Sequence, residues 1–173
     1  MNLVLRSLST NDSEAFLEGF TLFSDMDTDW YSFVWKKGMS HEEHLKILDN
    51  RFHGRDLLPG RVTDSMLYAF LDGKIVGRSS IRHTLNNHLI KFGGHIGYAV
   101  ATPYRYKGIA TEILKQSLVY CRDVLKLDRV LVTCDENNFG SIKTIERNGG
   151  IFENQILNEG KTVHTNRYWI QLT

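Results

Sequence analysis

Alternating and helically spaced hydrophobic positions predict one strand and two helices in the first third of the chain. Residues 2–8 alternate enough to form a strand. Residues 9–12 offer several helix caps, and apolar residues follow at helical spacing at Ala15, Phe16, Gly19, Phe20 and Phe23. Ser40 and Glu43 form a capping box for a second helix, which carries the apolar stripe Leu45, Leu48 and Phe52. This region is therefore expected to be a strand followed by two helices.

The central region predicts an antiparallel meander of three strands, over residues 66–71, 74–83 and 89–100. Asp72 and Gly73 make a favoured two-residue hairpin turn between the first two strands. Asn86 and Asn87 mark a second tight turn. Residues 93–94 are a Gly-Gly pair inside the third strand, where glycines often mark a bulge or the close approach of a ligand. The meander leads directly into the next predicted helix.

The last third predicts helices that alternate with strands. Helices are expected over residues 109–125 and 141–147, and strands over residues 130–132, 151–157 and 162–172. The run at residues 130–132 is continuously apolar, which is typical of a strand buried on both faces. Residues 148–150 end the second helix, and residues 159–160 turn the closing hairpin. The predicted order is β-α-α-β-β-β-α-β-α-β-β, a mixed sheet with helices packed on it.

Length and composition indicate one ordinary globular domain. The chain has 173 residues, of which 42% are hydrophobic and 24% are charged, and this is enough to bury a sizeable core. Its net charge of +1 predicts no broad attraction to nucleic acid or to an anionic membrane. No apolar run is long enough to span a membrane, and the first residues lack the apolar core of a signal peptide. With only Cys121 and Cys134, we expect a reducing, cytoplasmic location and no disulfide framework.

The most informative segment links the end of a predicted strand at Val100 to the start of a helix. After a proline-bearing turn it reads Arg105-x-x-Gly108-x-Ala110. Backbone N–H groups at a helix start have no partner within the helix and attract anions. Small residues at positions 108 and 110 let this backbone approach a ligand, and Arg105 and Lys107 add positive charge. The pattern suits the binding of a pyrophosphate, although a strand-turn-helix connection without a ligand has the same local pattern.

This segment resembles the acetyl-coenzyme A signature of the GNAT N-acetyltransferase superfamily. A second match follows it, since Asn138, Ser141 and Gly149 have the spacing of an Asn, an Ala or Ser and a helix-ending Gly in that family. The resemblance is good over residues 66–170 and extends to the first third only in the order of its elements. It implies a single α+β domain over residues 1–173. The implied architecture is a central mixed, mostly antiparallel twisted sheet of about seven strands with helices on both faces, splayed between the fourth and fifth strands.

The resemblance also implies acetyl-coenzyme A (acetyl-CoA) as the cosubstrate and no metal. The strand edge at residues 98–100 would bind the pantetheine arm, and the following turn would bind the pyrophosphate through its main-chain N–H groups. Asn138 and Ser141 would lie beside the pantetheine or the thiol. The expected cofactor-binding residues are Ala99, Val100, Arg105, Tyr106, Lys107, Gly108, Ile109, Ala110, Thr111, Asn138 and Ser141.

The implied reaction is direct attack of a primary amine on a thioester, so a base or a water chain must remove a proton from the amine. His95 is the leading candidate for the base, because imidazole titrates near neutral pH. The alternative interpretation is a histidine that is simply hydrogen-bonded at the start of the fourth strand. Many family members have a tyrosine that protonates the departing thiolate, but Ile145 occupies that position here. Tyr98 is a candidate for this role, together with Tyr104 and Tyr168.

Three other features have competing interpretations. The aromatic segment at residues 30–35 either lines a substrate pocket or covers an edge of the core. Cys134 is interpreted as a small buried thiol rather than an acyl-accepting nucleophile, because no neighbour that would favour a thiolate is evident. His41 and His44 lack the His-Glu-x-x-His order of zinc hydrolases, so we expect them at the surface and predict no metal site.

Two functions remain open. The first is an acetyl-CoA-dependent N-acetyltransferase that acts on a small molecule, an amino-acid derivative or a peptide amine. The second is a non-catalytic acyl-CoA sensor or interaction module with the same fold, which the loss of a tyrosine at Ile145 favours. A nucleotide-binding protein is a weaker third candidate, because the chain lacks a Gly-Lys-Ser/Thr triplet. The two helices near the N-terminus and residues 51–64 would frame the acceptor, and the resemblance leaves a homodimer open.

Overall fold

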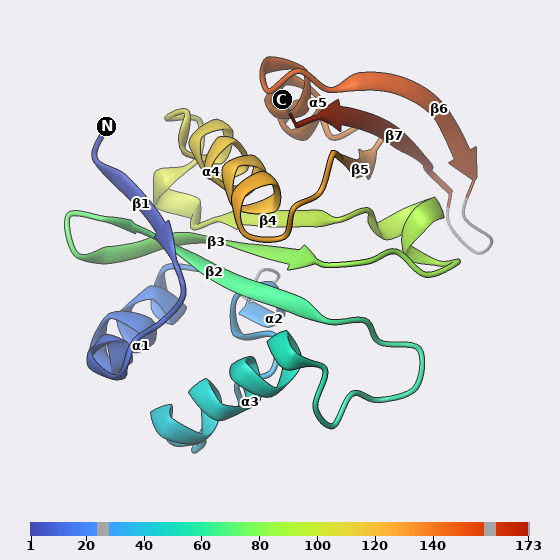
Figure 1. The fold of residues 1–173 in the computed structure, drawn as a ribbon. Coiled ribbons are helices and arrows are strands. Elements are labelled where there is room, and N and C mark those ends of the chain that lie inside the picture. The colour runs from blue at the N-terminus through green and yellow to red at the C-terminus, as the bar shows by residue number, and fades with distance from the viewer. Residues whose placement is uncertain (24–27, 158–161, 173) are drawn as a thin grey trace.

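The computed structural model describes residues 1–23, 28–157 and 162–172, which form two β-sheets with helices around them (Figure 1). The larger sheet has the order β1-β2-β3-β4 and consists of β1 (Leu3–Arg6), β2 (Asp64–Leu71), β3 (Lys74–Arg82) and β4 (Ile96–Val100). The smaller sheet has the order β5-β7-β6 and consists of β5 (Arg129–Asp135), β7 (His164–Gln171) and β6 (Ile151–Leu157). Neighbouring strands within both sheets are antiparallel. The predicted α+β class with about seven strands is confirmed.

Helices cover both faces of the larger sheet, as expected (Figure 1). On one side lie α1 (Ser13–Leu22), α2 (Thr28–Ser32) and α3 (His41–His53). On the other side lies α4 (Ile109–Asp123), with α5 (Phe139–Arg147) packed beside it and against β5. The predicted order omitted α2 and three short helical turns, at Thr10–Asp12, Leu89–Gly93 and Thr102–Tyr104.

The predicted turn and cap chemistry is present. Asp72 (φ 50°) and Gly73 (φ 80°) both have positive φ, as a two-residue turn between twisted antiparallel strands requires. The Ser40 hydroxyl accepts a hydrogen bond from the Glu43 amide at 3.1 Å and so caps α3. Gly54 ends that helix in the left-handed region. The turn of the closing hairpin at residues 159–160 lies outside the described residues.

The third strand of the meander is shorter than predicted, because β4 begins only at Ile96. The segment Leu89–Gly93 forms one π-helical turn instead. Asn86 starts this turn, since its side-chain oxygen accepts hydrogen bonds from the amides of His88 at 3.1 Å and Leu89 at 2.9 Å. The prediction of a strand through this segment was wrong because a capping side chain, and not the apolar pattern, determines its conformation.

The two sheets meet at one point and separate beyond it. The His95 amide donates to the Leu131 carbonyl at 2.7 Å, and the Leu131 amide donates to His95 Nδ1 at 2.9 Å. Gly94 allows this approach, since it has φ +61° and a Cβ there would come within 2.5 Å of the Leu131 oxygen. Beyond this junction β4 and β5 belong to different sheets. The predicted splay between the fourth and fifth strands is therefore confirmed.

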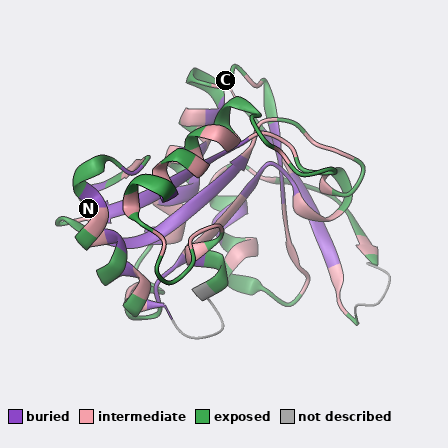
Figure 2. Cartoon of the chain, turned by 90° about the horizontal axis from the view of Figure 1, so that it is seen from below, coloured by how far each residue is buried: buried purple, intermediate pink, exposed green. Residues whose placement is uncertain are grey.

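Two hydrophobic layers enclose the larger sheet, and the buried residues are concentrated in its strands (Figure 2). The layer under α1 and α3 contains Phe16, Tyr31 and Tyr68. His44, which we expected at the surface, is fully buried in this layer with its ring 4.8 Å from that of Phe16. Burial lowers the pKa of His44 to about 4. Within the described ranges, no helix has the length and apolar character needed to cross a bilayer.

Candidate functional site

A cavity of about 960 Å³ lies where β4 and β5 separate. Its walls come from β4, the start of α4, the end of β5 and α5. The volume is at the upper end of the roughly 300–1,000 Å³ typical of sites that bind small molecules. Among the described residues, no cluster of three or more His, Cys, Asp or Glu side chains could hold a metal ion. The cavity therefore suits a large organic ligand that lies between the two sheets.

The turn before α4 presents a row of unpaired main-chain donors to this cavity. Gly108 caps the helix with φ 78°, and Tyr106 is also left-handed with φ 61°. After Arg105, the next amide that donates a hydrogen bond to a described residue is that of Glu112. It donates to Gly108 O at 3.2 Å. No described residue accepts a hydrogen bond from the amides of residues 106–111. Six consecutive N–H groups at a helix start form a ready site for an anion.

Most of the predicted cofactor-binding residues line this one cavity. They are Ala99, Val100, Arg105, Tyr106, Gly108, Ile109, Ala110, Thr111, Asn138 and Ser141. Arg105 also fixes the turn to the end of β4, because its Nε donates to Val100 O at 3.0 Å. Lys107 does not line the cavity: its Nζ donates to Pro103 O at 3.0 Å and lies over the ring of Tyr104. The side chain of Lys107 is therefore directed to the turn itself, and only its main-chain amide belongs to the row of donors.

Asn138 and Ser141 lie at the start of α5, on the wall opposite the turn. The Asn138 side-chain oxygen accepts a hydrogen bond from the Ser141 amide at 3.1 Å, so this asparagine is the N-cap of the helix. The cap orients the first turn of α5 beside the cavity. The spacing of these two residues in the sequence thus reflects a helix cap at the site.

Tyr98 points from β4 toward α5, and its hydroxyl is buried beside Ser141 and Thr144. Burial raises the pKa of Tyr98 to about 12, although the two neighbouring hydroxyls act in the opposite direction. The phenol is therefore protonated at neutral pH and can donate a hydrogen bond into the cavity. The position on α5 where many family members have a tyrosine is occupied by Ile145. This side chain is fully buried in the core and cannot donate a hydrogen bond into the cavity.

His95 does not line the cavity, and its ring is used by the backbone. The imidazole Nδ1 accepts the Leu131 amide at the junction of the two sheets, and the side chain is nearly fully buried. Burial lowers the pKa of His95 to about 4, so the ring is neutral near pH 7. This environment favours the second interpretation of His95, a hydrogen-bonded residue at the start of the strand, over that of a base.

Cys134 lines the cavity from the end of β5, but its environment does not favour a thiolate. Burial raises the pKa of this thiol to about 12, and the negative charges of Asp135 and Glu146 raise it further. The thiol therefore stays protonated near neutral pH. This agrees with the interpretation of Cys134 as a small buried side chain rather than a nucleophile.

The aromatic segment at residues 30–35 both lines the cavity and covers the core, with different side chains in each position. Trp30 is 46% exposed and lines the cavity, whereas Tyr31 is fully buried and its hydroxyl donates to Phe16 O at 2.8 Å. Trp35 packs edge-on against Phe16. The segment thus covers the core with some side chains and presents Trp30 to a ligand.

The charged residues of segment 51–64, which was expected to frame the acceptor, pair with one another or lie outside the cavities. Arg51 pairs with Asp64, with 2.9 Å between Nε and Oδ1, and Arg55 pairs with Asp49. The cavity between the sheets and a smaller one beneath α2 are lined by none of Arg51, Arg55, Asp56, Arg61 and Asp64.

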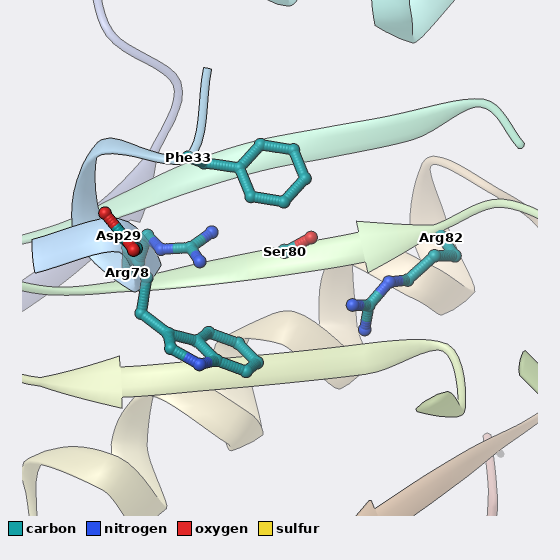
Figure 3. A pocket seen from close by; sticks show the side chains of 6 residues that line it. Asp29, Phe33, Arg78, Ser80 and Arg82 are labelled. Atoms are coloured by element: carbon teal, nitrogen blue, oxygen red, sulfur yellow. The ribbon is translucent and has the colours of Figure 1, made fainter. Parts of the chain in front are cut away.

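The smaller cavity contains residues that sequence reasoning missed, namely Arg78, Ser80 and Arg82 on β3 (Figure 3). A signal for them exists in the sequence, because two arginines lie inside a predicted strand and residues 78, 80 and 82 share one of its faces. This pair of arginines could therefore have marked a polar site on the strand.

Comparisons with known proteins agree with this geometry. A family model described as an acetyltransferase (GNAT) domain matches residues 2–151. Among solved structures, a ribosomal-protein-S5-alanine acetyltransferase from Vibrio fischeri is 16% identical, with a TM-score of 0.65 over 99% of this chain and 94% of that one. A spermidine N-acetyltransferase from Vibrio cholerae, solved with CoA and spermine, is 17% identical, with a TM-score of 0.63 over 98% and 95%.

A third solved structure, from Salmonella typhimurium, was determined with its cofactor acetyl-CoA. It is 13% identical, with a TM-score of 0.63 over 100% of this chain and 95% of that one. A comparison with curated protein sequences found no match. At these identities the similar structures establish a shared fold, whereas the family model covers most of the chain.

Proposed function

The chain belongs to the acetyltransferase (GNAT) family, and from this premise we propose that it transfers an acetyl group from acetyl-CoA directly to a primary amine. The proposed acceptor is a small molecule, an amino-acid derivative or a peptide. We also propose that residues 1–173 act as one acetyltransferase domain. The extent of the family match and the nearly complete coverage of the similar structures support this.

The row of unpaired amides at residues 106–111 is the observation that carries the proposal. These donors lie at the mouth of the large cavity, at the positive end of the α4 dipole. A pyrophosphate bound there would place an attached pantetheine chain along β4. Asn138 and Ser141 would contact that chain from the other wall, at the start of α5.

The edge of β4 can bind both the pantetheine amides and the developing oxyanion. The Ala101 amide donates to Val76 O on β3, at 2.9 Å. Because successive residues of a strand alternate in direction, Tyr98 and Val100 direct their amides away from β3 and toward the cavity. Acetyl-CoA supplies an acyl group activated as a thioester. A main-chain amide aimed at its carbonyl oxygen would stabilise the transition state by about 3 kcal/mol.

The amine must lose a proton before it attacks, and among the described residues two carboxylates line the cavities. Asp29 lies on the acceptor side in the smaller cavity, and Asp135 lies at the end of β5 in the larger one. We propose that a chain of water molecules carries the proton from the amine to one of these side chains. His95 is not needed for this step, since its Nδ1 is occupied by the Leu131 amide.

Tyr98 is proposed to stabilise the departing thiolate. A phenol with a pKa of about 12 is a weaker acid than a free thiol, whose ordinary pKa is about 8.5. Complete proton transfer would therefore be uphill, and a hydrogen bond from the phenol to the sulfur is the more favourable contribution. Tyr98 thereby takes on, from β4, the role that Ile145 cannot fill from α5.

Amine-dependent release of free thiol from acetyl-CoA tests the proposal most simply. A panel of primary amines should include one that accelerates thiol release above the rate of hydrolysis, with the N-acetylated amine as the product. An acyl-CoA sensor would also gain thermal stability from acetyl-CoA, but it would release no thiol with any amine. That outcome would refute the transferase and support the sensor, which the buried Ile145 would then explain.

A further inference from the structure

A second cavity, of about 230 Å³, lies beneath α2 and against β3 (Figure 3). It is lined by Asp29, Trp30, Phe33, Arg78, Ser80 and Arg82. The three β3 residues share the face of the strand that points toward α2, and Figure 3 shows Ser80 between the two arginines. Two cations on one small concave surface cost free energy unless an anion pairs with them.

Arg78 is the unusual member, because it is a fully buried cation without an acidic partner. Its side chain is 1% exposed, and no described carboxylate forms an ion pair with it. One donor, Nη1, lies 2.7 Å from the weak acceptor Sδ of Met66, and Nε has no partner. Burial lowers the pKa of Arg78 only to about 10, so the guanidinium keeps its charge at neutral pH. Among the described residues, Nε therefore has no acceptor and Nη1 has only a weak one.

The surrounding groups do not neutralise this charge. Arg82 is half-buried, and its acceptor among the described residues is Gly93 O at 3.5 Å. Asp64 favours the charged form of both arginines, but it is bound by Arg51. The hydroxyl of Ser80 is buried without a partner. Asp29 is the single carboxylate among the described lining residues, so these side chains together carry a net positive charge.

We propose that this cavity binds a carboxylate group of the acceptor, so that the enzyme acetylates amines that also carry a carboxylate. This proposal rests on the proposed function and specifies its substrate class. A guanidinium presents a planar pair of donors that matches the two oxygens of a carboxylate. Trp30 and Phe33 lie over Arg78, each 5.3 Å from its guanidinium carbon. They hold the side chain in place and shield the ion pair from water.

The position of the cavity fits an acceptor site. Trp30 and Arg82 line the smaller cavity and the larger one between the sheets. Gly97 of β4 separates the two, since a Cβ there would lie 3.2 Å from both side chains. An acceptor with its carboxylate at Arg78 would therefore extend its amine past Gly97, toward the proposed position of the thioester.

The test compares N-acetyl amino acids with their uncharged carboxamides, using thermal stability as the readout. The pairs are the derivatives of alanine, leucine and phenylalanine, which differ only in the carboxylate and need no turnover. The acids should raise Tm and the carboxamides should not. In Arg78→Met the dissociation constant of the acids should rise at least about tenfold. Arg55→Met, which removes an exposed arginine paired with Asp49, is the matched control and should bind the acids as the parent does.

Several results would overturn the proposal. These are equal stabilisation by acids and carboxamides, no stabilisation by any acid, or unchanged affinity in Arg78→Met. Stabilisation by phosphate monoesters but by no carboxylate would assign the cavity to a different anion and also overturn it. If Arg78→Met does not fold, Arg82→Gln provides the same comparison. The affinity for acetyl-CoA is measured separately in the same variants. A failure to bind acetyl-CoA would refute the proposed function and leave the carboxylate result standing.

Discussion

The two cavities next to β4 differ in the groups that they present to a ligand. The larger one presents main-chain amides of residues 106–111 together with the edge of β4. The smaller one presents side chains, with buried Arg78 and half-buried Arg82 on β3 and aromatic rings next to Arg78. Main-chain donors require only the right backbone path, and this path leaves a short local pattern in the sequence. A side-chain site instead depends on which strands and helices are brought together.

The strongest test of the main-chain site is Gly108→Glu. Position 108 has φ +78° with nothing within 4 Å of a Cβ, so the new side chain has room but its carboxylate would face the bound pyrophosphate. Strain at positive φ and charge repulsion together should weaken acetyl-CoA binding at least about 100-fold. Calorimetry measures this loss, while circular dichroism checks the fold.

Gly60→Glu is the matched control for that variant. Gly60 has φ +77° and open space around its Cβ, but it lies in the loop before β2 and lines neither cavity. It should carry the same backbone strain and keep the affinity for acetyl-CoA. An unchanged affinity in Gly108→Glu would contradict the assignment of the turn to the pyrophosphate.

Tyr98→Phe tests the side chain in the larger cavity that is proposed to stabilise the departing thiolate. Loss of its hydrogen bond to the thiolate should lower kcat about tenfold and leave the dissociation constant of acetyl-CoA unchanged. Tyr120→Phe serves as the control, because the Tyr120 hydroxyl contacts Ser65 away from both cavities. Steady-state kinetics on both variants decide the matter, and a parental kcat in Tyr98→Phe would exclude the proposed role.

Gly97→Ala should affect the acceptor and not the cosubstrate. The added methyl would lie 3.2 Å from Trp30 and from Arg82 and would narrow the passage between the cavities. We expect KM for the acceptor to rise about fivefold, with the affinity for acetyl-CoA within twofold of the parent. An equal loss of affinity for both substrates would show that Gly97 does not separate two sites.

The smallest effect on activity is expected for His95→Asn. The asparagine oxygen can replace Nδ1 as the acceptor for the Leu131 amide, so kcat/KM should stay within about twofold of the parent. A loss of 100-fold or more would restore His95 as the base.

His95→Asn should also change stability at low pH. Burial holds the pKa of His95 at about 4, below the ordinary value near 6.5 in the unfolded chain. The unfolded state thus binds more protons, and the stability that the neutral ring contributes above pH 6.5 is lost as the pH falls toward 4. Removing His95 should make this decline shallower by about 2 kcal/mol, as measured by denaturant unfolding at pH 7 and pH 4.5.

The sequence predicted the main-chain site and much of the fold because both have local causes. Gly108 and Ala110 mark the turn, Asp72 and Gly73 mark the hairpin, and Ser40 caps α3. Each of these acts through residues close to it in the chain, so spacing alone reveals it.

Non-local contacts account for what the sequence did not reveal. His95 accepts a hydrogen bond from Leu131, which is far away in the chain, so the ordinary pKa of imidazole did not reveal this environment. Arg78 gains its character from Trp30 and Phe33, which α2 places over β3. His44 is buried because α3 packs its inner face on the larger sheet. These environments arise only once the elements are assembled.

Hydrogen exchange at the amides of residues 106–111 tests the central claim most directly. No residue in the described part of the chain accepts a hydrogen bond from these amides, so they should exchange rapidly without ligand. Saturating acetyl-CoA should slow their exchange at least about tenfold, whereas the amides of the loop around Gly60 should not change. Unaltered exchange at residues 106–111 in a protein that demonstrably binds acetyl-CoA would contradict the account.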